Sequence, residues 1–453
     1  MGRTVLLVPP DKAGHIRDTY YGCWHRRKFV SYRWPPLMLS YLRAQIPDSA
    51  LFDAPARGLT AEQTLAELAR MQPSLVVTNM GTFTAQDDAP FLREVRQLGC
   101  AVAVFGEYAT LSTEQALRHA DFAVRGEPEC VVPALAASVG KYLDGEMSAA
   151  AIAEETHESL CAPGRMGKRH LVTRLDSLPF PLRSPDEKRL YRNPFAKRSP
   201  FTTMLATRGC PYDCIFCTVP ALYGKSFRIR SPANVLDEME MLSREGYREL
   251  FFRDENLTLH RRFITSLCKD ILSRGIDTAW MSNSRVDTVD AELLDLMAKA
   301  GCHLLKFGVE SFSDETLATI KKGATASSIR RAFSLCQDAG IETVAHMMLG
   351  NPGEDEEMVG RNIEELRALG PTYASFDVAL TYPETELSRM EHAGRGTAIP
   401  AERLQMLHDA AFRRFYLRPR LLMRHLRGVR SPAEFAGKLR ATGELWLGLA
   451  RVA

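Results

Sequence analysis

Three cysteines on one short loop constrain this chain more than any other feature of its sequence. Cys210, Cys214 and Cys217 stand in the stretch Arg-Gly-Cys-Pro-Tyr-Asp-Cys-Ile-Phe-Cys, directly after the strand-like run from Thr202 to Thr207. A cubane iron–sulfur cluster takes four thiolates, so three thiolates from one loop leave one iron without a protein ligand. An open coordination position marks a metal site for chemistry rather than for structure.

Two other interpretations of these cysteines are structural core cysteines and a zinc site that borrows a histidine from elsewhere. Buried free cysteine is common, but the chain's other cysteines are scattered singly along the sequence. Zinc sites favour paired Cys-x2-Cys or His-x3-His units, and no second pair lies near the loop. The clustering therefore favours an iron–sulfur cluster.

The composition is that of an ordinary globular protein without a signal for export. The 453 residues are enough for two to four domains, and a net charge of +3 gives no reason to expect nucleic acid as a partner. No long apolar run is present, and the first residues are broken too early by Pro9-Pro10 for a signal peptide. We therefore expect a cytoplasmic protein with reduced thiols.

Strand-like and helix-like runs alternate over the first 140 residues, which predicts a parallel sheet with helices on both faces. The expected strands are 4–8, 50–53, 75–78, 101–105 and 122–124, and the expected helices are 36–43, 61–71, 90–98 and 112–119. Residues 1–140 are thus predicted to form a Rossmann-like domain, with the loop 14–34 beyond its first strand, where such sheets bind ligands. The absence of Gly-x-Gly-x-x-Gly argues against a dinucleotide.

The second half of the chain repeats a strand-then-helix pattern six times, after a proline-rich connector at 141–198. We expect a partial (βα)6 TIM barrel over 199–385, followed by a helical C-terminal region at 386–453. The expected strands begin at Phe201 and continue at 249–254, 278–283, 302–309, 342–349 and 373–379. The expected helices are 232–244, 261–273, 291–300, 314–322, 327–339 and 354–369. Parallel barrels carry their chemistry at the carboxyl ends of the strands.

Acidic residues follow several of the predicted barrel strands. Asp254 and Glu310 each stand at a strand end. An acid there can accept hydrogen bonds from an ammonium group or from ribose hydroxyls, or it can cap the following helix. Both roles stay open for Asp254, whereas a cofactor contact is favoured for Glu310. Gly353-Glu354 is expected to turn the chain and start a helix.

The cysteine loop and the barrel pattern resemble the radical SAM superfamily, whose Cys-x3-Cys-x2-Cys loop holds a [4Fe-4S] cluster. In that family the open iron binds S-adenosylmethionine (SAM). The resemblance implies that Cys210, Cys214 and Cys217 are the metal ligands and catalytic residues. It implies that Glu310 is the best SAM contact and that Lys322 pairs with the SAM carboxylate. The full set of implied SAM contacts is Phe216 beside the adenine, Asp254, Asn283, Arg285, Glu310, Lys322 and Gly350, the last giving backbone access to the adenine.

The N-terminal domain resembles the cobalamin-binding domain of one radical SAM branch, which includes the anaerobic Mg-protoporphyrin ester cyclases and hopanoid-modifying enzymes. The resemblance is carried by residues 36–42, 78–84, 124–129 and 175–181, and it implies cobalamin contacts at Thr78, Thr82 and Gly106. Two departures stand out. The Asp-x-His-x-x-Gly element is absent, and the family's Gly-Gly pair reads Gly106-Glu107, which narrows the backbone approach. A domain that kept the fold and lost the cofactor is the alternative.

The resemblance implies an enzyme that cleaves SAM to a 5′-deoxyadenosyl radical and, with cobalamin, methylates an unactivated carbon of a small-molecule or lipid-like substrate. Ring closure or rearrangement without methyl transfer stays open, as does a non-catalytic cobalamin- or SAM-binding sensor. An electron donor such as flavodoxin or ferredoxin is the implied protein partner. The basic helical tail from Arg403 onward either packs on the barrel or contacts a membrane surface.

Overall fold

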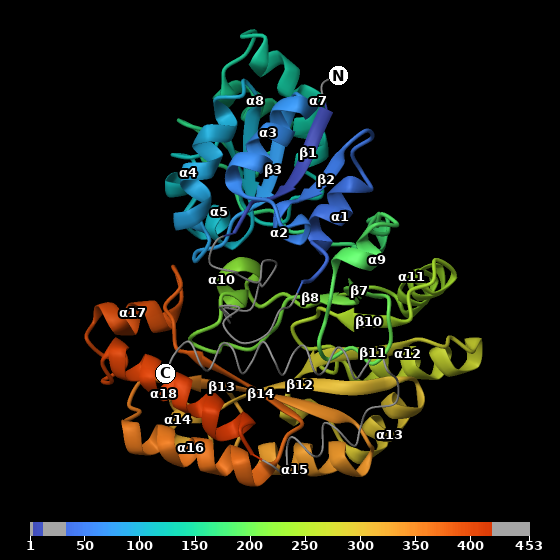
Figure 1. The fold of residues 1–453 in the computed structure, drawn as a ribbon, viewed down its shortest axis with the longest axis vertical. Helices are drawn as coiled ribbons and strands as arrows, with labels where there is room; N and C mark the ends of the chain where they lie inside the picture. Colours follow the sequence, from blue (N-terminus) through green and yellow to red (C-terminus); the bar gives the residue numbers. More distant parts are fainter. Residues whose placement is uncertain (1–2, 12–32, 419–453) are drawn as a thin grey trace. The chain divides into compact units, whose positions relative to one another are not determined.

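The computed structural model describes residues 3–11 and 33–418. Its chain divides into two compact units, which Figure 1 colours from blue to red along the sequence. Within the described residues, unit 1 comprises 3–11, 33–191 and 221–224, and unit 2 comprises 192–220 and 225–418. The residues from 141 to 191, predicted as a connector, therefore cluster with unit 1.

Unit 1 contains a six-stranded sheet in the order β2-β1-β3-β4-β5-β6. Strands β1 to β5 run parallel, and β6 pairs antiparallel with β5. The strand order reverses between β1 and β3, and such a switch point is where open parallel sheets bind ligands. The strands are β1 (Arg3–Val8), β2 (Ala50–Asp53), β3 (Pro73–Asn79), β4 (Ala101–Phe105), β5 (Phe122–Val124) and β6 (Leu160–Cys161).

The helices of unit 1 follow the predicted alternation, but several differ from it. Helix α4 begins earlier than expected and includes Pro90, which costs the helix a single backbone hydrogen bond. Helix α5 lies before the expected helix 112–119, α6 covers only the first part of that helix, and α2, α7, α8 and α9 were not predicted. The helices are α1 (Leu37–Arg43), α2 (Ala54–Arg57), α3 (Ala61–Met71), α4 (Ala85–Arg96), α5 (Glu107–Leu111), α6 (Thr113–Ala116), α7 (Val132–Leu143), α8 (Ala149–Thr156) and α9 (Glu187–Leu190).

Unit 2 contains a six-stranded, wholly parallel sheet in the order β14-β13-β12-β11-β10-β7. This order follows the chain, as repeated strand–helix units require. The strands are β7 (Phe201–Met204), β10 (Glu249–Phe252), β11 (Ala279–Ser284), β12 (Cys302–Glu310), β13 (Glu342–Leu349) and β14 (Tyr373–Val378). A short hairpin of β8 (Thr207–Arg208) and β9 (Arg228–Ile229) flanks the cysteine loop.

In unit 2, Figure 1 shows the helices α15 and α16 below the strands β12 to β14. Helix α16 begins two residues later than predicted, because Asp355 accepts the Met358 N–H at 2.7 Å and caps it. The helices are α10 (Val219–Tyr223), which the division between the units cuts, α11 (Pro232–Arg244), α12 (Arg261–Arg274), α13 (Ala291–Lys299), α14 (Asp314–Thr319), α15 (Ala326–Asp338), α16 (Glu356–Leu369), α17 (Glu386–His392) and α18 (Ala401–Tyr416).

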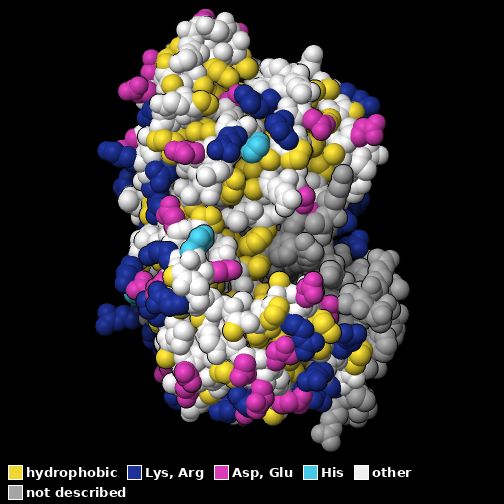
Figure 2. Space-filling view, turned by 90° about the vertical axis from the view of Figure 1, so that its left-hand side faces the viewer, with side chains coloured by type: hydrophobic (Ala, Val, Ile, Leu, Met, Phe, Trp, Pro, Cys, Tyr) yellow, Lys and Arg dark blue, Asp and Glu magenta, His cyan; other side chains and the backbone are white. Residues whose placement is uncertain are grey.

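Side chains alternate along β12 and so divide the core of unit 2 from its open face. Leu305, Phe307 and Val309 point into the apolar core between the sheet and the helices. Lys306 and Glu310, at the positions between and after them, therefore share the other face. Basic and acidic side chains are intermixed over the surface shown in Figure 2. Within residues 3–11 and 33–418, no helix is long and apolar enough to cross a membrane.

Candidate active site

The cysteine loop leaves the short strand β8 through a glycine that no other residue could replace without strain. Gly209 has φ +90°, and a Cβ there would lie 2.2 Å from the Ser226 carbonyl oxygen. The Gly209 N–H donates to Glu255 Oε2 at 3.1 Å. Further along, the backbone N–H of Ile215 donates to the Ile320 carbonyl at 3.2 Å. The loop is thus fixed on both sides of the span that carries Cys210 and Cys214.

The three thiols of the loop are partly exposed and lie close enough to influence one another electrostatically. Burial raises the pKa of Cys210 to about 11 and that of Cys217 further. Among the described residues, no three His, Cys, Asp or Glu side chains converge on a point where one metal ion would sit, as zinc requires. A cubane instead engages each cysteine through a different iron. The donor set therefore fits a cluster.

Asp254, which follows β10, anchors the start of the cysteine loop. Its carboxylate is fully buried and accepts the Ala206 N–H at 3.2 Å and the Thr207 hydroxyl at 2.6 Å, together with the Thr207 N–H. Burial raises the pKa of Asp254 to about 6, although these hydrogen bonds oppose the shift. Asp254 thus holds the start of the cysteine loop and caps no helix among the described residues, and its contact with SAM stays a prediction.

Two neighbours of Asp254 extend this support. Asn283, a predicted SAM contact, donates its side-chain amide to the Asp254 carbonyl at 2.8 Å. Glu255, which sequence reasoning missed, holds the N–H of Gly209, and burial raises its pKa to about 7. The missed signal was a second acid directly after the strand-end Asp254.

Three predicted SAM residues come together beside the loop. Glu310 ends β12 with φ +65°, and its Oε1 accepts from Lys322 Nζ at 2.8 Å. Both side chains are buried over Gly308, where a Cβ would lie 2.5 Å from each of them. Lys322 Nζ also lies 5.8 Å from the centroid of the Phe216 ring. The structure therefore pairs Lys322 with Glu310 and places both beside Phe216.

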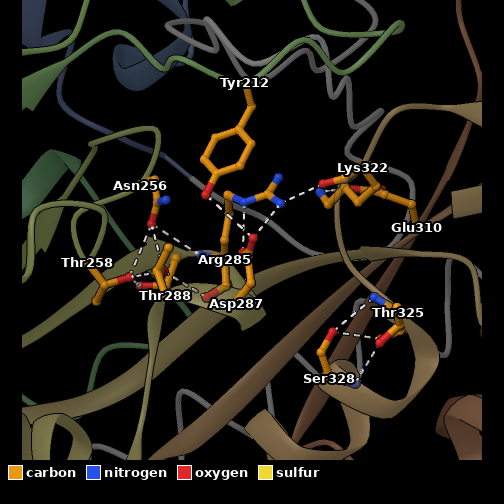
Figure 3. A network of polar contacts seen from close by, with 11 residues as sticks. Tyr212, Asn256, Thr258, Arg285, Asp287, Thr288, Glu310, Lys322, Thr325 and Ser328 are labelled. Carbon is orange, nitrogen blue, oxygen red and sulfur yellow. Dashed lines mark hydrogen bonds and ion pairs between the residues drawn. The ribbon is translucent and has the colours of Figure 1, made fainter. Parts of the chain in front are cut away.

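Arg285 is engaged entirely by the protein (Figure 3). Its Nε and Nη2 donate to the two oxygens of Asp287 at 2.9 Å each, and Nη2 also donates to the Lys322 carbonyl at 2.5 Å. The guanidinium carbon lies 3.6 Å from the centroid of the Tyr212 ring. The side chain is buried. These contacts differ from the expected contact with SAM.

Gly350 gives room to a helix. With φ +80°, it lies where a Cβ would be 2.8 and 2.9 Å from the methyl carbons of Leu404 on α18, so its small size serves packing against that helix. Glu354 also differs from expectation. It does not begin α16, and its buried carboxylate accepts the N–H groups of Gly350 at 3.1 Å and Asn351 at 2.9 Å.

Polar side chains that sequence reasoning missed occupy the open face of the sheet in unit 2. Lys306 Nζ lies 5.1 Å from the Phe251 ring centroid. His346 Nδ1 lies 2.5 Å from Ser375 Oγ on the next strand, and that hydroxyl donates to Asp377 at 3.4 Å. The available signal was polar residues at alternate positions of otherwise apolar strands, as in Lys306 and Glu310.

In unit 1 the predicted cobalamin residues stand at the carboxyl ends of β3 and β4. The hydroxyl of Thr82 donates to Glu107 Oε1 at 2.5 Å, and the N–H of Thr82 donates to Oε2 at 2.8 Å. Gly106 has φ +106°, and a Cβ there would lie 2.8 Å from Asn79 Oδ1. Glu107 thus bridges the two loops. It stands where the cobalamin-binding family has the second glycine of the Gly-Gly pair, and its carboxylate binds Thr82.

Thr78 lines a small apolar pocket at the switch point of the unit 1 sheet. The lining residues are Leu7, Val8, Pro9, Pro36, Met38, Leu39, Thr78 and Asn79, from the carboxyl ends of β1 and β3 and the start of α1. The Thr78 hydroxyl is buried and donates to the Asn79 carbonyl at 3.3 Å. Most of the predicted ligand loop, 14–34, lies outside the described residues, as does the basic tail beyond 418.

An open parallel sheet with a three-cysteine loop at its strand ends is the arrangement expected of a protein that holds an iron–sulfur cluster for chemistry. Residues 204–366 match the model of the Radical SAM superfamily. Apart from 221–224, the matched residues lie within unit 2, and the superfamily they resemble implies a [4Fe-4S] cluster and SAM as cofactors.

Known proteins resemble the chain over most of its length. An uncharacterized methyltransferase of Pyrococcus horikoshii is 27% identical over 452 residues, covering 93% of this chain and 94% of the relative. An anaerobic magnesium-protoporphyrin IX monomethyl ester cyclase of Rubrivivax gelatinosus is 26% identical over 382 residues, covering 79% of this chain and 66% of the relative.

The fold also occurs in a solved structure. The radical SAM methyltransferase TsrM of Kitasatospora setae, with cobalamin and a [4Fe-4S] cluster bound, matches with a TM-score of 0.66 at 21% identity. The match covers 87% of this chain and 76% of TsrM. At this identity the likeness shows a shared α/β fold with a parallel-sheet radical SAM core.

Proposed function

We propose that the protein is a cobalamin-dependent radical SAM methyltransferase that acts on an unactivated carbon of a small-molecule or lipid-like substrate. In this proposal residues 1–140 bind cobalamin, 141–198 connect, 199–385 form a partial (βα)6 barrel, and 386–453 form a helical C-terminal region. The methyltransferase names of the relatives, one of them similar over 93% of the chain, support the reaction class.

The observation that carries the proposal is the cysteine loop beside a buried ion pair. Cys210, Cys214 and Cys217 are the proposed ligands of the cluster. The Glu310–Lys322 pair places a carboxylate and an ammonium side by side, 2.8 Å apart, with the ammonium 5.8 Å from the centroid of the Phe216 ring. This ion pair complements the amino-acid end of SAM, because the carboxylate can bind its ammonium group and the ammonium can bind its carboxylate.

In this proposal the other predicted SAM residues do not touch SAM but hold the backbone around its site in place. Asp254 and Asn283 hold the entry to the cysteine loop. Arg285 braces the loop, and Gly350 makes room for α18. These four residues therefore position the site, while the proposed direct contacts to SAM are Phe216, Glu310 and Lys322.

The proposed cobalamin site in unit 1 rests on the pocket at the switch point. This pocket lies where open parallel sheets bind ligands, and the buried Thr78 stands in its wall. Gly106 packs against Asn79, which lines the same pocket. Thr82, in the loop after β3, donates a hydrogen bond to Glu107. OxsB, a cobalamin-dependent S-adenosylmethionine radical enzyme solved with aqua-cobalamin bound, shares the fold at a TM-score of 0.62 and 17% identity.

When bound, the cluster supplies the electron that cleaves SAM to methionine and a 5′-deoxyadenosyl radical, and cobalamin supplies the methyl group. The chain's own residues bind and orient. Glu310 and Lys322 fix the amino-acid end of SAM, which makes the cleavage effectively intramolecular. Lys306 and His346, on the same open face of the sheet, are placed to orient a polar group of the substrate.

The test is anaerobic reconstitution with iron, sulfide and hydroxocobalamin, followed by dithionite and SAM. We expect 5′-deoxyadenosine by chromatography and a corrinoid spectrum that persists through gel filtration. Cys214→Ala should abolish 5′-deoxyadenosine while leaving the corrinoid bound, because the cysteine belongs to unit 2 and the pocket to unit 1. Deoxyadenosine without retained corrinoid would remove cobalamin from the proposal.

A second candidate function is ring formation without methyl transfer, which the cyclase of Rubrivivax gelatinosus favours as a relative. Methylation consumes a second SAM and releases S-adenosylhomocysteine, whereas ring chemistry does not. Absence of S-adenosylhomocysteine during substrate turnover would therefore favour ring formation. Complete absence of 5′-deoxyadenosine from cluster-loaded protein would favour a non-catalytic sensor.

The remaining predictions concern partners and location. A flavodoxin or ferredoxin as electron donor, a cytoplasmic location and contact of the basic tail with a membrane surface stay predictions. Flotation with anionic vesicles at low salt tests the last of them, since a basic amphipathic surface should co-float.

A further inference from the structure

A buried arginine stacks on the middle of the cysteine loop. Gly209 and Ile215 are fixed by backbone hydrogen bonds on either side of the span that carries Cys210 and Cys214. Within that span, the Tyr212 ring lies on the guanidinium of Arg285, with 3.6 Å between the guanidinium carbon and the ring centroid. We propose that Arg285 is a positioning residue that clamps the cysteine loop in its ligating conformation before the cluster is inserted.

Arg285 can act as a clamp because it is itself held rigidly (Figure 3). Asp287 takes two parallel hydrogen bonds of 2.9 Å, which fixes the plane of the guanidinium. The Lys322 carbonyl takes a third bond at 2.5 Å. The backbone N–H of Arg285 donates to the buried Asn256 side chain at 3.3 Å. A cation whose plane is fixed in this way loses little freedom when an aromatic ring stacks on it.

The clamp links three strand ends to the loop. Arg285 and Asp287 follow β11, Asn256 follows β10, and Lys322, which pairs with Glu310 at the end of β12, follows α14. Lys322 also lies over Phe216, the aromatic residue just before Cys217. The loop is therefore bracketed by a cation over an aromatic ring on each side of Cys214. Three thiolates that must meet three irons at once gain from such preorganisation, because the loop entropy is lost before the ligands bind.

The same loop offers a matched control. Asp213 and Lys225 also form an ion pair, but both side chains are largely exposed, at 47% and 69%. An exposed pair contributes little, because water and salt screen it. The proposal therefore assigns the conformation of the loop to Tyr212–Arg285 and not to Asp213–Lys225, although Tyr212 and Asp213 are adjacent.

The experiment compares Tyr212→Leu, Tyr212→Phe, Arg285→Lys and Lys225→Ala in the full chain. Hydrogen exchange of the loop amides is measured anaerobically without the cluster, and iron release to a chelator is measured after reconstitution. Tyr212→Leu and Arg285→Lys should each speed both processes about tenfold, the size expected for a cation–π contact whose cation is buried. Tyr212→Phe should behave as wild type, because it keeps the ring and loses only a 3.4 Å contact to Asp287. Lys225→Ala should also behave as wild type.

Two outcomes would overturn the clamp. Loop exchange in Tyr212→Leu equal to that of the wild type would show that the stack orders nothing. Loss of labelled SAM binding in Arg285→Lys, with unchanged exchange and iron release, would make Arg285 a SAM ligand instead. The inference rests on the proposed assignment of the three cysteines to the cluster. A wild-type chain that takes up no iron would sink that assignment, whereas the exchange measurement on the cluster-free chain still tests the clamp.

Discussion

Both units hold a loop at a strand end with a carboxylate from the neighbouring strand end. In unit 1 Glu107, after β4, bonds the backbone and hydroxyl of Thr82, after β3. In unit 2 Asp254, after β10, bonds the backbone of Ala206 and both the backbone and hydroxyl of Thr207, after β7. Each pair of strands is adjacent in its sheet, so the carboxylate bridges two neighbouring loops.

The two bridges differ in how deeply they are buried. Asp254, Ala206 and Thr207 are all buried, so removal of the carboxylate leaves donors that water cannot reach. Thr82 is half-buried, so water can replace part of what Glu107 provides. The loop that carries the three thiols is therefore the more rigidly held. The same kind of carboxylate bridge thus supports both a tightly fixed cysteine loop and a looser loop beside an apolar pocket.

The largest expected effect is that of Asp254→Ala. Three buried donors lose their acceptor, which should lower the free energy of unfolding of unit 2 by about 3 kcal/mol. The cysteine loop should also lose its iron after reconstitution. Asp237→Ala is the control, since Asp237 is 59% exposed and bonds only on the surface. Urea unfolding and iron analysis measure both effects, and a variant with wild-type iron content would contradict the bridge in unit 2.

Gly106→Ala tests the loop ends of unit 1 and should come next in size. The new Cβ would lie 2.8 Å from Asn79 Oδ1 at φ +106°, so strain and a clash add to about 2 kcal/mol. Gly99→Ala separates the two contributions, because Gly99 has φ +81° and nothing within 4 Å of a Cβ. Thermal unfolding should therefore show a clear loss for Gly106→Ala and a smaller one for Gly99→Ala. Equal losses would mean that close packing against Asn79 adds nothing.

The sequence predicts what is local in both regions. The thiol spacing of the cysteine loop is contained in eight residues, and strands such as Ala101–Phe105 and Glu342–Leu349 were predicted with their observed bounds. Apolar runs bounded by turn residues carry that information. The same local signals placed Glu310 at a strand end, where the structure finds it beside Lys322.

What the sequence does not predict is which groups each polar side chain meets. The bridge from Asp254 to Thr207 spans 47 residues, and that from Glu107 to Thr82 spans 25. A strand-end acid looks alike in the sequence whether it faces a ligand or a neighbouring loop. Arg285 and Gly350 show the same limit, because their contacts with Tyr212 and Leu404 come from segments that are distant in the sequence.

Glu107→Ala sharpens the contrast between the units. Removing the carboxylate frees the N–H and hydroxyl of Thr82, but water reaches both, so the loss should be about 1 kcal/mol. Amide exchange at 81–85 should rise, while exchange in the cysteine loop of unit 2 should not change. A loss as large as that of Asp254→Ala would remove the proposed difference in depth between the two bridges.

The smallest effect is expected from Glu107→Gln, and it depends on pH. Burial raises the pKa of Glu107 above its usual value of 4.5, with the bonds from Thr82 opposing the shift. A carboxyl whose pKa is higher in the folded than in the unfolded state stabilises the fold below its unfolded-state pKa. It loses that contribution as pH rises through its folded-state pKa.

The substituted amide would keep an acceptor for the Thr82 N–H without a charge to bury. The variant should therefore match the wild type near pH 4 and become the more stable of the two towards neutral pH, as followed by urea unfolding across that range. A wild type that gains stability over the variant as pH rises would mean that the hydrogen bonds from Thr82 outweigh the burial of the charge.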